Sequence, residues 1–139
     1  MSEQEFNQRL KREFAVMQRK FPGFMLYKSQ GRSYKFAPCG RIYWEGKLTT
    51  NFGTTYTVVV LYPANYPHGQ LQAFVPELID EDNVMHMYRD GHLCLYSNDH
   101  GGLGEGIGLE TSASTIVAWC AAWLNAYEVF RRTGKWPGR

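Results

Sequence analysis

One short segment of the chain, HMYRDGHLCLYSN at residues 86–98, constrains both its fold and its function. Asp90-Gly91 indicates a tight turn, because glycine accepts a positive φ at no steric cost. The turn would deliver Leu93-Cys94-Leu95 as a short extended segment, whose leucines share one face while Cys94 takes the other. If the leucines are anchored in the core, the Cys94 thiol should point away from it, as nucleophilic sulfur chemistry requires.

Outside this segment, the composition indicates a single globular domain over residues 1–139. Apolar residues make up 44% of the chain and aromatic residues 15%, which argues against disorder. The net charge of +2 gives no reason to expect a nucleic-acid or membrane-surface partner. Three cysteines cannot all pair internally, and the sequence has neither a secretory segment nor a membrane-length apolar run. We therefore expect a cytoplasmic protein with at least one reduced thiol.

An amphipathic helix is predicted near the N-terminus. Ser2 and Glu5 form a capping-box pattern, and Pro22-Gly23 ends the helix. Its apolar face carries residues at helical spacing, namely Phe6, Leu10, Phe14 and Met17. Basic residues, among them Arg9 and Arg12, fall mostly elsewhere on the helix. They form either a solvated face or a docking surface for an acidic partner, with Arg9 and Arg12 as its candidate binding residues.

Between residues 24 and 75 the pattern changes to that of strands. Aromatic and β-branched residues recur in four runs separated by turn residues: Phe24–Lys28, Arg41–Leu48, Thr54–Tyr62 and Leu71–Val75. Their short connections favour an antiparallel meander. The segment YPANYP at residues 62–67 interrupts the strands, because two prolines cannot sit inside a central strand.

A glycine-rich run and a second helix complete the chain. Residues 100–108, HGGLGEGIG, match neither GxGxxG nor a phosphate-binding P-loop, so we interpret them as a flap beside the cysteine segment. The long helix that follows is capped by Thr111 or Ser112 and ended by Gly134. Its apolar stripe comprises Ile116, Cys120, Trp123, Tyr127 and Phe130. The expected fold class is therefore α+β, with an N-terminal helix, a four-stranded antiparallel meander, an irregular cysteine segment and a long C-terminal helix.

The residues alone leave three roles open for Cys94. It could be a buried structural cysteine, which is the commonest fate of a lone cysteine. It could be a nucleophile assisted by histidine. It could also be a metal ligand together with the histidines, namely His68, His86, His92 and His100, although their spacing matches no common zinc pattern. Cys39 lies in the turn Pro38-Cys39-Gly40 and is interpreted as incidental.

Two motifs, in this order, resemble those of ubiquitin-conjugating enzymes. The YPANYP segment resembles the family's signature after its third strand. Residues 90–95, DGHLCL, resemble its Gly-x-Ile-Cys-Leu active-site segment, and Cys94 takes the place of the cysteine. The resemblance covers most of the chain, from Glu5 to Phe130, and implies the family's α+β fold.

Departures from the family pattern indicate which branch of the family the chain resembles. Val84, Met85 and His86 replace the family's His-Pro-Asn triplet. The glycine-rich run replaces a tryptophan expected soon after the cysteine, and the final helices are reduced to one. In these respects the chain is similar to compact bacterial relatives encoded in antiphage operons, some of which stand beside a cyclic-oligonucleotide synthase in CBASS systems.

The resemblance implies a thioester mechanism without a cofactor or metal. Cys94 would receive a protein's C-terminal carboxylate from an activating enzyme or another thioester donor, and an acceptor amine or thiol would then attack the thioester. His86, at the place of the family's asparagine, would support the active-site loop or the oxyanion, and His92 would relay a proton. Asn98 and Asp99 would orient the incoming amine.

The implied partner in antiphage defence is the C-terminus of a cyclic-oligonucleotide synthase. Two alternatives stay open. The chain could be the conjugating enzyme of a bacterial ubiquitin-like pathway, carrying a ubiquitin-like protein. It could also be a catalytically silent binding module of the same fold.

Overall fold

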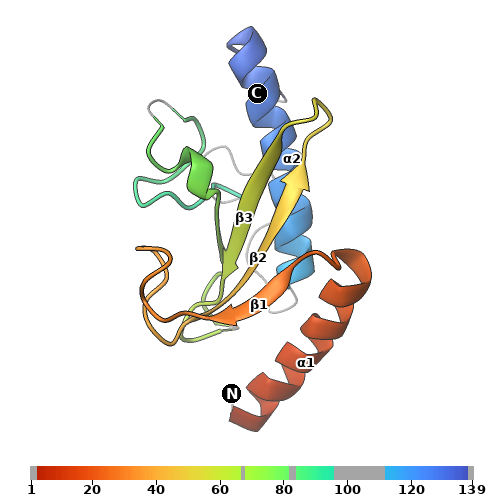
Figure 1. Ribbon diagram of the computed structural model, residues 1–139, viewed down its shortest axis with the longest axis vertical. Coiled ribbons are helices and arrows are strands. Elements are labelled where there is room, and N and C mark those ends of the chain that lie inside the picture. The colour runs from red at the N-terminus through yellow and green to blue at the C-terminus, as the bar shows by residue number, and fades with distance from the viewer. Residues whose placement is uncertain (1–2, 67, 82–83, 96–111, 138–139) are drawn as a thin grey trace.

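Two helices and one antiparallel sheet form the computed structural model, which describes residues 3–66, 68–81, 84–95 and 112–137. Its elements are α1 (Glu3–Lys20), β1 (Met25–Lys28), β2 (Ile42–Thr49), β3 (Thr55–Leu61), β4 (Gln72–Phe74), the short 3-10 helix η1 (Pro76–Leu78) and α2 (Ala113–Thr133). The sheet order is β1-β2-β3-β4 with every pair antiparallel. Figure 1 shows α2 behind the sheet and α1 at the β1 end. The predicted α+β class and meander are confirmed, and β4 is shorter than expected.

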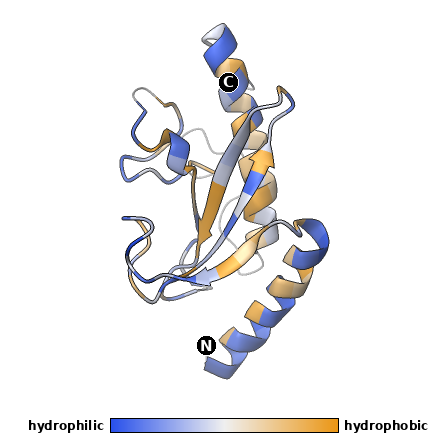
Figure 2. Ribbon diagram, in the orientation of Figure 1, coloured by the Kyte–Doolittle hydropathy of each residue, from blue (hydrophilic) through white to orange (hydrophobic). Residues whose placement is uncertain are grey.

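The core lies between the sheet and the helices. Val58 and Val60 of β3 belong to the same buried cluster as Trp123 of α2, and Figure 2 shows that α2 is most apolar along its middle. The intervening residues Val59 and Leu61 face the other side of the sheet. There they form a smaller cluster, completed by residues of β2, β4 and the loop between β1 and β2: Tyr43, Phe74, Tyr34, Phe36 and Ala37.

The buried face of α1 differs from the predicted one. Phe14 keeps 38% of its surface exposed, although its ring contacts Trp44, whereas Glu13 is only 6% exposed. The inward positions are Phe6, Leu10, Glu13 and Met17, which is the ordinary spacing of a packed helix with one carboxylate included. Ser2, the predicted capping residue, lies outside the described residues.

Glu13 joins α1 to two distant parts of the chain. Its carboxylate accepts hydrogen bonds from the hydroxyls of Tyr62 (3.0 Å) and Tyr66 (2.6 Å), both in the YPANYP segment. It also accepts one from the Ala113 backbone N–H (3.0 Å), and the Arg9 guanidinium lies 3.3 Å away. Burial and the neighbouring carboxylate raise the pKa of both tyrosines, so their hydroxyls stay protonated as donors.

The N-terminus of α2 is capped by this carboxylate and not by a hydroxyl. Ser112 occupies the N-cap position, but its side chain makes no capping hydrogen bond and contacts Ser114 and Thr115 instead. A carboxylate at the positive end of a helix is favoured by charge as well as by hydrogen bonding, which explains why Glu13 takes this role. Thr111, the other predicted cap, lies outside the described residues.

The C-terminus of α2 follows the prediction. Gly134 ends the helix in the left-handed conformation at φ 78°, and its N–H donates to the Phe130 carbonyl (2.8 Å). Nearly two turns before Gly134, the buried Glu128 carboxylate accepts hydrogen bonds from the Tyr56 hydroxyl and the Arg132 guanidinium. Burial raises the pKa of Glu128, but these two hydrogen bonds and the Arg132 charge outweigh burial and hold the pKa below its ordinary value.

The lowered pKa of Glu128 makes a prediction for acid stability. A carboxyl whose folded pKa is lowered stabilises the fold above its unfolded pKa of 4.5, and this contribution is lost as the pH falls through the folded pKa. Glu128→Gln should therefore lower the free energy of unfolding at pH 7, and the difference from wild type should shrink below pH 4.5. Urea unfolding of both proteins at several pH values measures this, and a difference that is constant with pH would contradict it.

Candidate active site

The cysteine segment forms a small hairpin. Met87 pairs with Leu93 as an antiparallel bridge, and the hydrogen bonds Tyr88 N–H to His92 (2.8 Å) and Cys94 N–H to His86 (2.9 Å) flank that pair. The turn at its tip closes with the Gly91 N–H donating to the Tyr88 carbonyl (2.9 Å), and Gly91 has φ 99°. The predicted Asp-Gly turn is confirmed.

The hairpin continues the sheet beyond β4. Phe74 of β4 forms an antiparallel bridge with His92, and the Leu93 N–H donates to the Ala73 carbonyl (2.9 Å). The tip packs against Ile79, the residue after η1, since a Cβ added to Gly91 would lie 3.0 Å from that side chain. The segment before Cys94 is therefore held by backbone hydrogen bonds on both sides.

The side chain of Cys94 lies outside the core between sheet and helices, as predicted, but it is buried and not exposed. Leu93 and Leu95 are 2% and 1% exposed and belong to the core between sheet and helices. Cys94 belongs to neither hydrophobic cluster, as strand alternation requires, yet only 5% of its surface is exposed. The expectation of an accessible thiol is thus wrong for this conformation, because alternation fixes the side toward which a residue points and not what covers it.

His86 supports Cys94 through its backbone. It is the only non-glycine residue with a positive φ (58°) in the described parts of the chain. Its carbonyl accepts both the Cys94 N–H (2.9 Å) and the Trp123 indole N–H (3.1 Å). Its ring packs edge to face on Trp136, with the ring centres 4.5 Å apart.

His92 is oriented by a neighbouring carboxylate. Its ring nitrogen Nδ1 lies 2.6 Å from Oδ1 of Asp90, and the same oxygen accepts the His92 backbone N–H (3.0 Å). The ring stacks on Tyr88 at 4.1 Å between ring centres. A carboxylate on one ring nitrogen leaves Nε2 to exchange a proton, which is how catalytic histidines are commonly oriented.

The four predicted binding residues lie apart from this hairpin or outside the described residues. Arg9 lies within hydrogen-bonding distance of Glu13 and the Tyr66 hydroxyl, and its side chain is 18% exposed, so its guanidinium already serves the buried network. Arg12 is exposed on α1, where docking stays a prediction. Asn98 and Asp99 lie outside the described residues.

The roles of two residues, one at the site and one on α1, were missed from the sequence. Trp123, interpreted as a core residue, donates to the same carbonyl oxygen as Cys94. Glu13 stands at a core position of α1, and the signal that could have revealed it is a carboxylate at the inward spacing of Leu10 and Met17. A buried carboxylate requires hydrogen-bond donors, and the tyrosines of YPANYP could have been matched to it.

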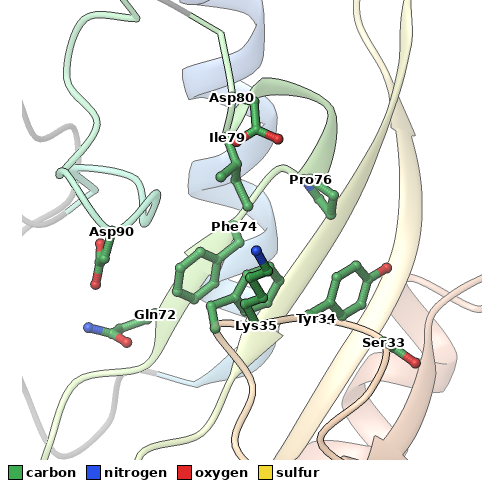
Figure 3. A pocket seen from close by; sticks show the side chains of 10 residues that line it. Ser33, Tyr34, Lys35, Gln72, Phe74, Pro76, Ile79, Asp80 and Asp90 are labelled. Atoms are coloured by element: carbon green, nitrogen blue, oxygen red, sulfur yellow. The ribbon is translucent and has the colours of Figure 1, made fainter.

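A pocket of about 530 Å³ opens beside the hairpin on the sheet face opposite the helices (Figure 3). Its walls include the stacked rings of Phe36 and Phe74, whose centres lie 3.9 Å apart. Lys35, Asp80 and Asp90 line it as charged groups. The pocket therefore borders the carboxylate that orients His92, because Asp90 is one of its lining residues.

The described residues offer no set of ligands for the metal site that was one of the three possible roles of Cys94. Among them, no three His, Cys, Asp or Glu side chains gather as potential ligands. His68 is exposed on the segment after YPANYP, whereas His100 falls outside the described ranges. All three cysteines are described, and none of them forms a disulfide.

The order of helix, four-stranded meander, cysteine hairpin and long helix defines an α+β protein with the fold of ubiquitin-conjugating, or E2, enzymes. The family model of the Type II CBASS E2 protein matches residues 13–139, and the chain belongs to this family. It is thus an E2-like protein of CBASS, an antiphage defence system. No curated protein matches the chain in sequence. Neither helix in the described ranges is both long and apolar enough to cross a membrane.

Proposed function

We propose that this E2-like protein carries the C-terminus of a protein as a thioester on Cys94 and passes it to an acceptor amine or thiol. The observation that carries the proposal is the match of residues 13–139 to the CBASS E2 family, in a chain whose Cys94 follows the Asp90-Gly91 turn. In the first step the Cys94 sulfur bonds to the carbonyl carbon of a donor thioester. The donor's sulfur leaves, and the Cys94 proton ends on the departing thiol.

In the second step the acceptor attacks the Cys94 thioester, and the sulfur of Cys94 leaves as the thiol. An amine acceptor loses one proton when the amide forms, and that proton balances the thiol. Exchange of one thioester for another is nearly balanced in energy, so the protein must chiefly supply position and stabilisation of the oxyanion. The hydrogen bond from Cys94 N–H to the His86 carbonyl supports a positioning role for His86.

His92 is suited to the second step more than to activating the thiol. Residues two apart on an extended strand point the same way, and their backbones lie about 6.6 Å apart, which leaves room for a water molecule between their side chains. His92 would therefore take the proton of the incoming amine through a water molecule, while Asp90 holds its other nitrogen. The 5% exposure of Cys94 implies that its covering contacts must open before a donor is bound.

The proposed partner is the C-terminus of a cyclic-oligonucleotide synthase, because the family belongs to CBASS. The burial of Cys94 favours one other candidate function, a silent binding module that keeps the fold without the chemistry. A ubiquitin-like protein as the carried chain is tested in the same way, with that protein as the donor.

The proposal is tested by looking for a covalent adduct on the folded protein. Incubation with a synthase C-terminal segment activated as a thioester should add the segment's mass, and a thiol reductant should remove it. Peptide mapping should place the adduct on Cys94 in wild type and in Cys39→Ala, which lacks the exposed thiol. An adduct on Cys39 alone would defeat the proposal, and binding of the segment without any adduct would establish the silent module.

A further inference from the structure

The backbone of His86 is held in a conformation that its side chain does not favour. A φ of 58° lies in the left-handed region, which is unfavourable for a residue with a Cβ. Such conformations persist only where their surroundings fix them. The position of Cys94 depends on this conformation, because the His86 carbonyl accepts the Cys94 N–H at 2.9 Å.

One contact that fixes this conformation comes from α2. The Trp123 indole N–H donates to the same carbonyl oxygen at 3.1 Å, so the oxygen holds two donors at once. Trp123 has no exposed surface and stacks on Tyr127 with ring centres 5.5 Å apart, so its indole is itself fixed. This shared oxygen is the point at which an indole of α2 bonds to the backbone of the cysteine hairpin.

A second contact comes from the chain after α2. The left-handed Gly134 reverses the chain and brings Trp136 back over Trp123, with ring centres 5.4 Å apart. Trp136 is 4% exposed and packs on the imidazole of His86. Its indole nitrogen makes no hydrogen bond within the described structure, so it holds His86 by packing alone.

We propose that Trp123 is a positioning residue for the chemistry at Cys94, acting through the carbonyl of His86, with Trp136 as a packing support. The indole hydrogen bond keeps His86 left-handed, and His86 in turn keeps the Cys94 backbone in place. The expected effect on group transfer rests on the proposed function, whereas the expected effect on thiol reactivity does not.

The first measurement compares two thiols of the same folded protein. Iodoacetamide should alkylate Cys94 slowly and the exposed Cys39 fast, and mass spectrometry gives the ratio of their rates. Trp123→Phe removes the indole donor, so the hairpin should open more often and the Cys94 rate relative to Cys39 should rise about five- to tenfold. The rate of transfer from a loaded Cys94 should fall, because the thioester is then less well placed.

A matched tryptophan separates positioning from general loss of stability. Trp44 is 1% exposed, and its indole N–H donates to the Tyr62 hydroxyl at 3.1 Å, away from His86. Trp44→Phe therefore also removes a buried indole donor, but it should leave the ratio of Cys94 to Cys39 alkylation near the wild-type value. An equal rise in both variants would overturn the proposal.

A second test uses the backbone of residue 86. Glycine adopts a positive φ without penalty, so in His86→Gly the left-handed conformation of residue 86 should depend less on the indole hydrogen bond. In that background, Trp123→Phe should change the alkylation ratio less than it does beside His86, and an equal change in both backgrounds would refute action through this conformation. If Trp123→Phe does not fold, Trp136→Phe takes its place with a smaller expected rise, and no rise would count against the proposal.

The two hypotheses fail in different ways. If wild type forms no thioester adduct but Trp123→Phe still raises Cys94 alkylation selectively, the proposed function fails and the positioning contact stands. If wild type forms the adduct and Trp123→Phe changes neither alkylation nor transfer, only the positioning contact fails.

Discussion

Cys94→Ser is expected to form an adduct that thiol reductant no longer removes, and Cys94→Ala is expected to form none. A serine oxygen can receive the acyl group as an ester, which thiols exchange far less readily than a thioester, whereas alanine offers no nucleophile. Serine should also load more slowly, because a hydroxyl is a weaker nucleophile than a thiol. Intact-mass measurement with and without reductant reads out both results.

The two other cysteines provide matched controls for this experiment. Cys39 is exposed, and Cys120 is buried on α2, where burial raises the pKa of its thiol and keeps it protonated. Alanine at either position should leave the reductant-sensitive adduct in place. If Cys94→Ala retained the adduct while Cys39→Ala lost it, the nucleophile would have been assigned to the wrong residue.

Glu13→Ala is expected to produce the largest loss of stability of any single replacement on α1. It removes the common acceptor of two tyrosine hydroxyls and the Ala113 N–H, all in a buried site. Leaving buried partners of a charged group unsatisfied typically costs about 3–5 kcal/mol, a large part of the stability of a domain of this size. Chemical unfolding monitored by tryptophan fluorescence measures the loss.

Two further variants check the cause of that loss. Glu3→Ala changes an exposed carboxylate on the same helix and should alter the free energy of unfolding by less than about 1 kcal/mol. Tyr66→Phe removes one hydrogen-bond donor to Glu13, so its loss of unfolding free energy should lie between those of Glu3→Ala and Glu13→Ala. A Glu13→Ala protein as stable as Glu3→Ala would show that the network contributes nothing.

The course of the chain could be predicted because its signals are local. Apolar periodicity and turn residues are read within a few positions of one another, so the meander and both helices could be predicted from them. The apolar face of α1 was wrong at Phe14 and Glu13, because a carboxylate is assigned to the surface unless its donors are known. Those donors come from residues 62, 66 and 113, which no helical pattern connects to α1.

The position of the candidate site in the chain was predicted, but its burial and backbone conformation were not. The Asp90-Gly91 turn and the opposite facing of Cys94 and its leucines follow from backbone chemistry, so the sequence contained them. The burial of Cys94 and the left-handed His86 depend on tertiary packing. A histidine carries no reliable signal of a positive φ, unlike the glycines at residues 91 and 134.

The bond between Glu13 and Ala113 links positions that stand 100 residues apart in the chain. Contacts of such long sequence separation form late in folding, because the intervening chain must lose its freedom first. During synthesis, α1 leaves the ribosome long before α2 exists, and its carboxylate stays hydrated until then. This part of the fold therefore cannot close until α2 has been made, and a nascent chain halted before α2 should remain open to proteases.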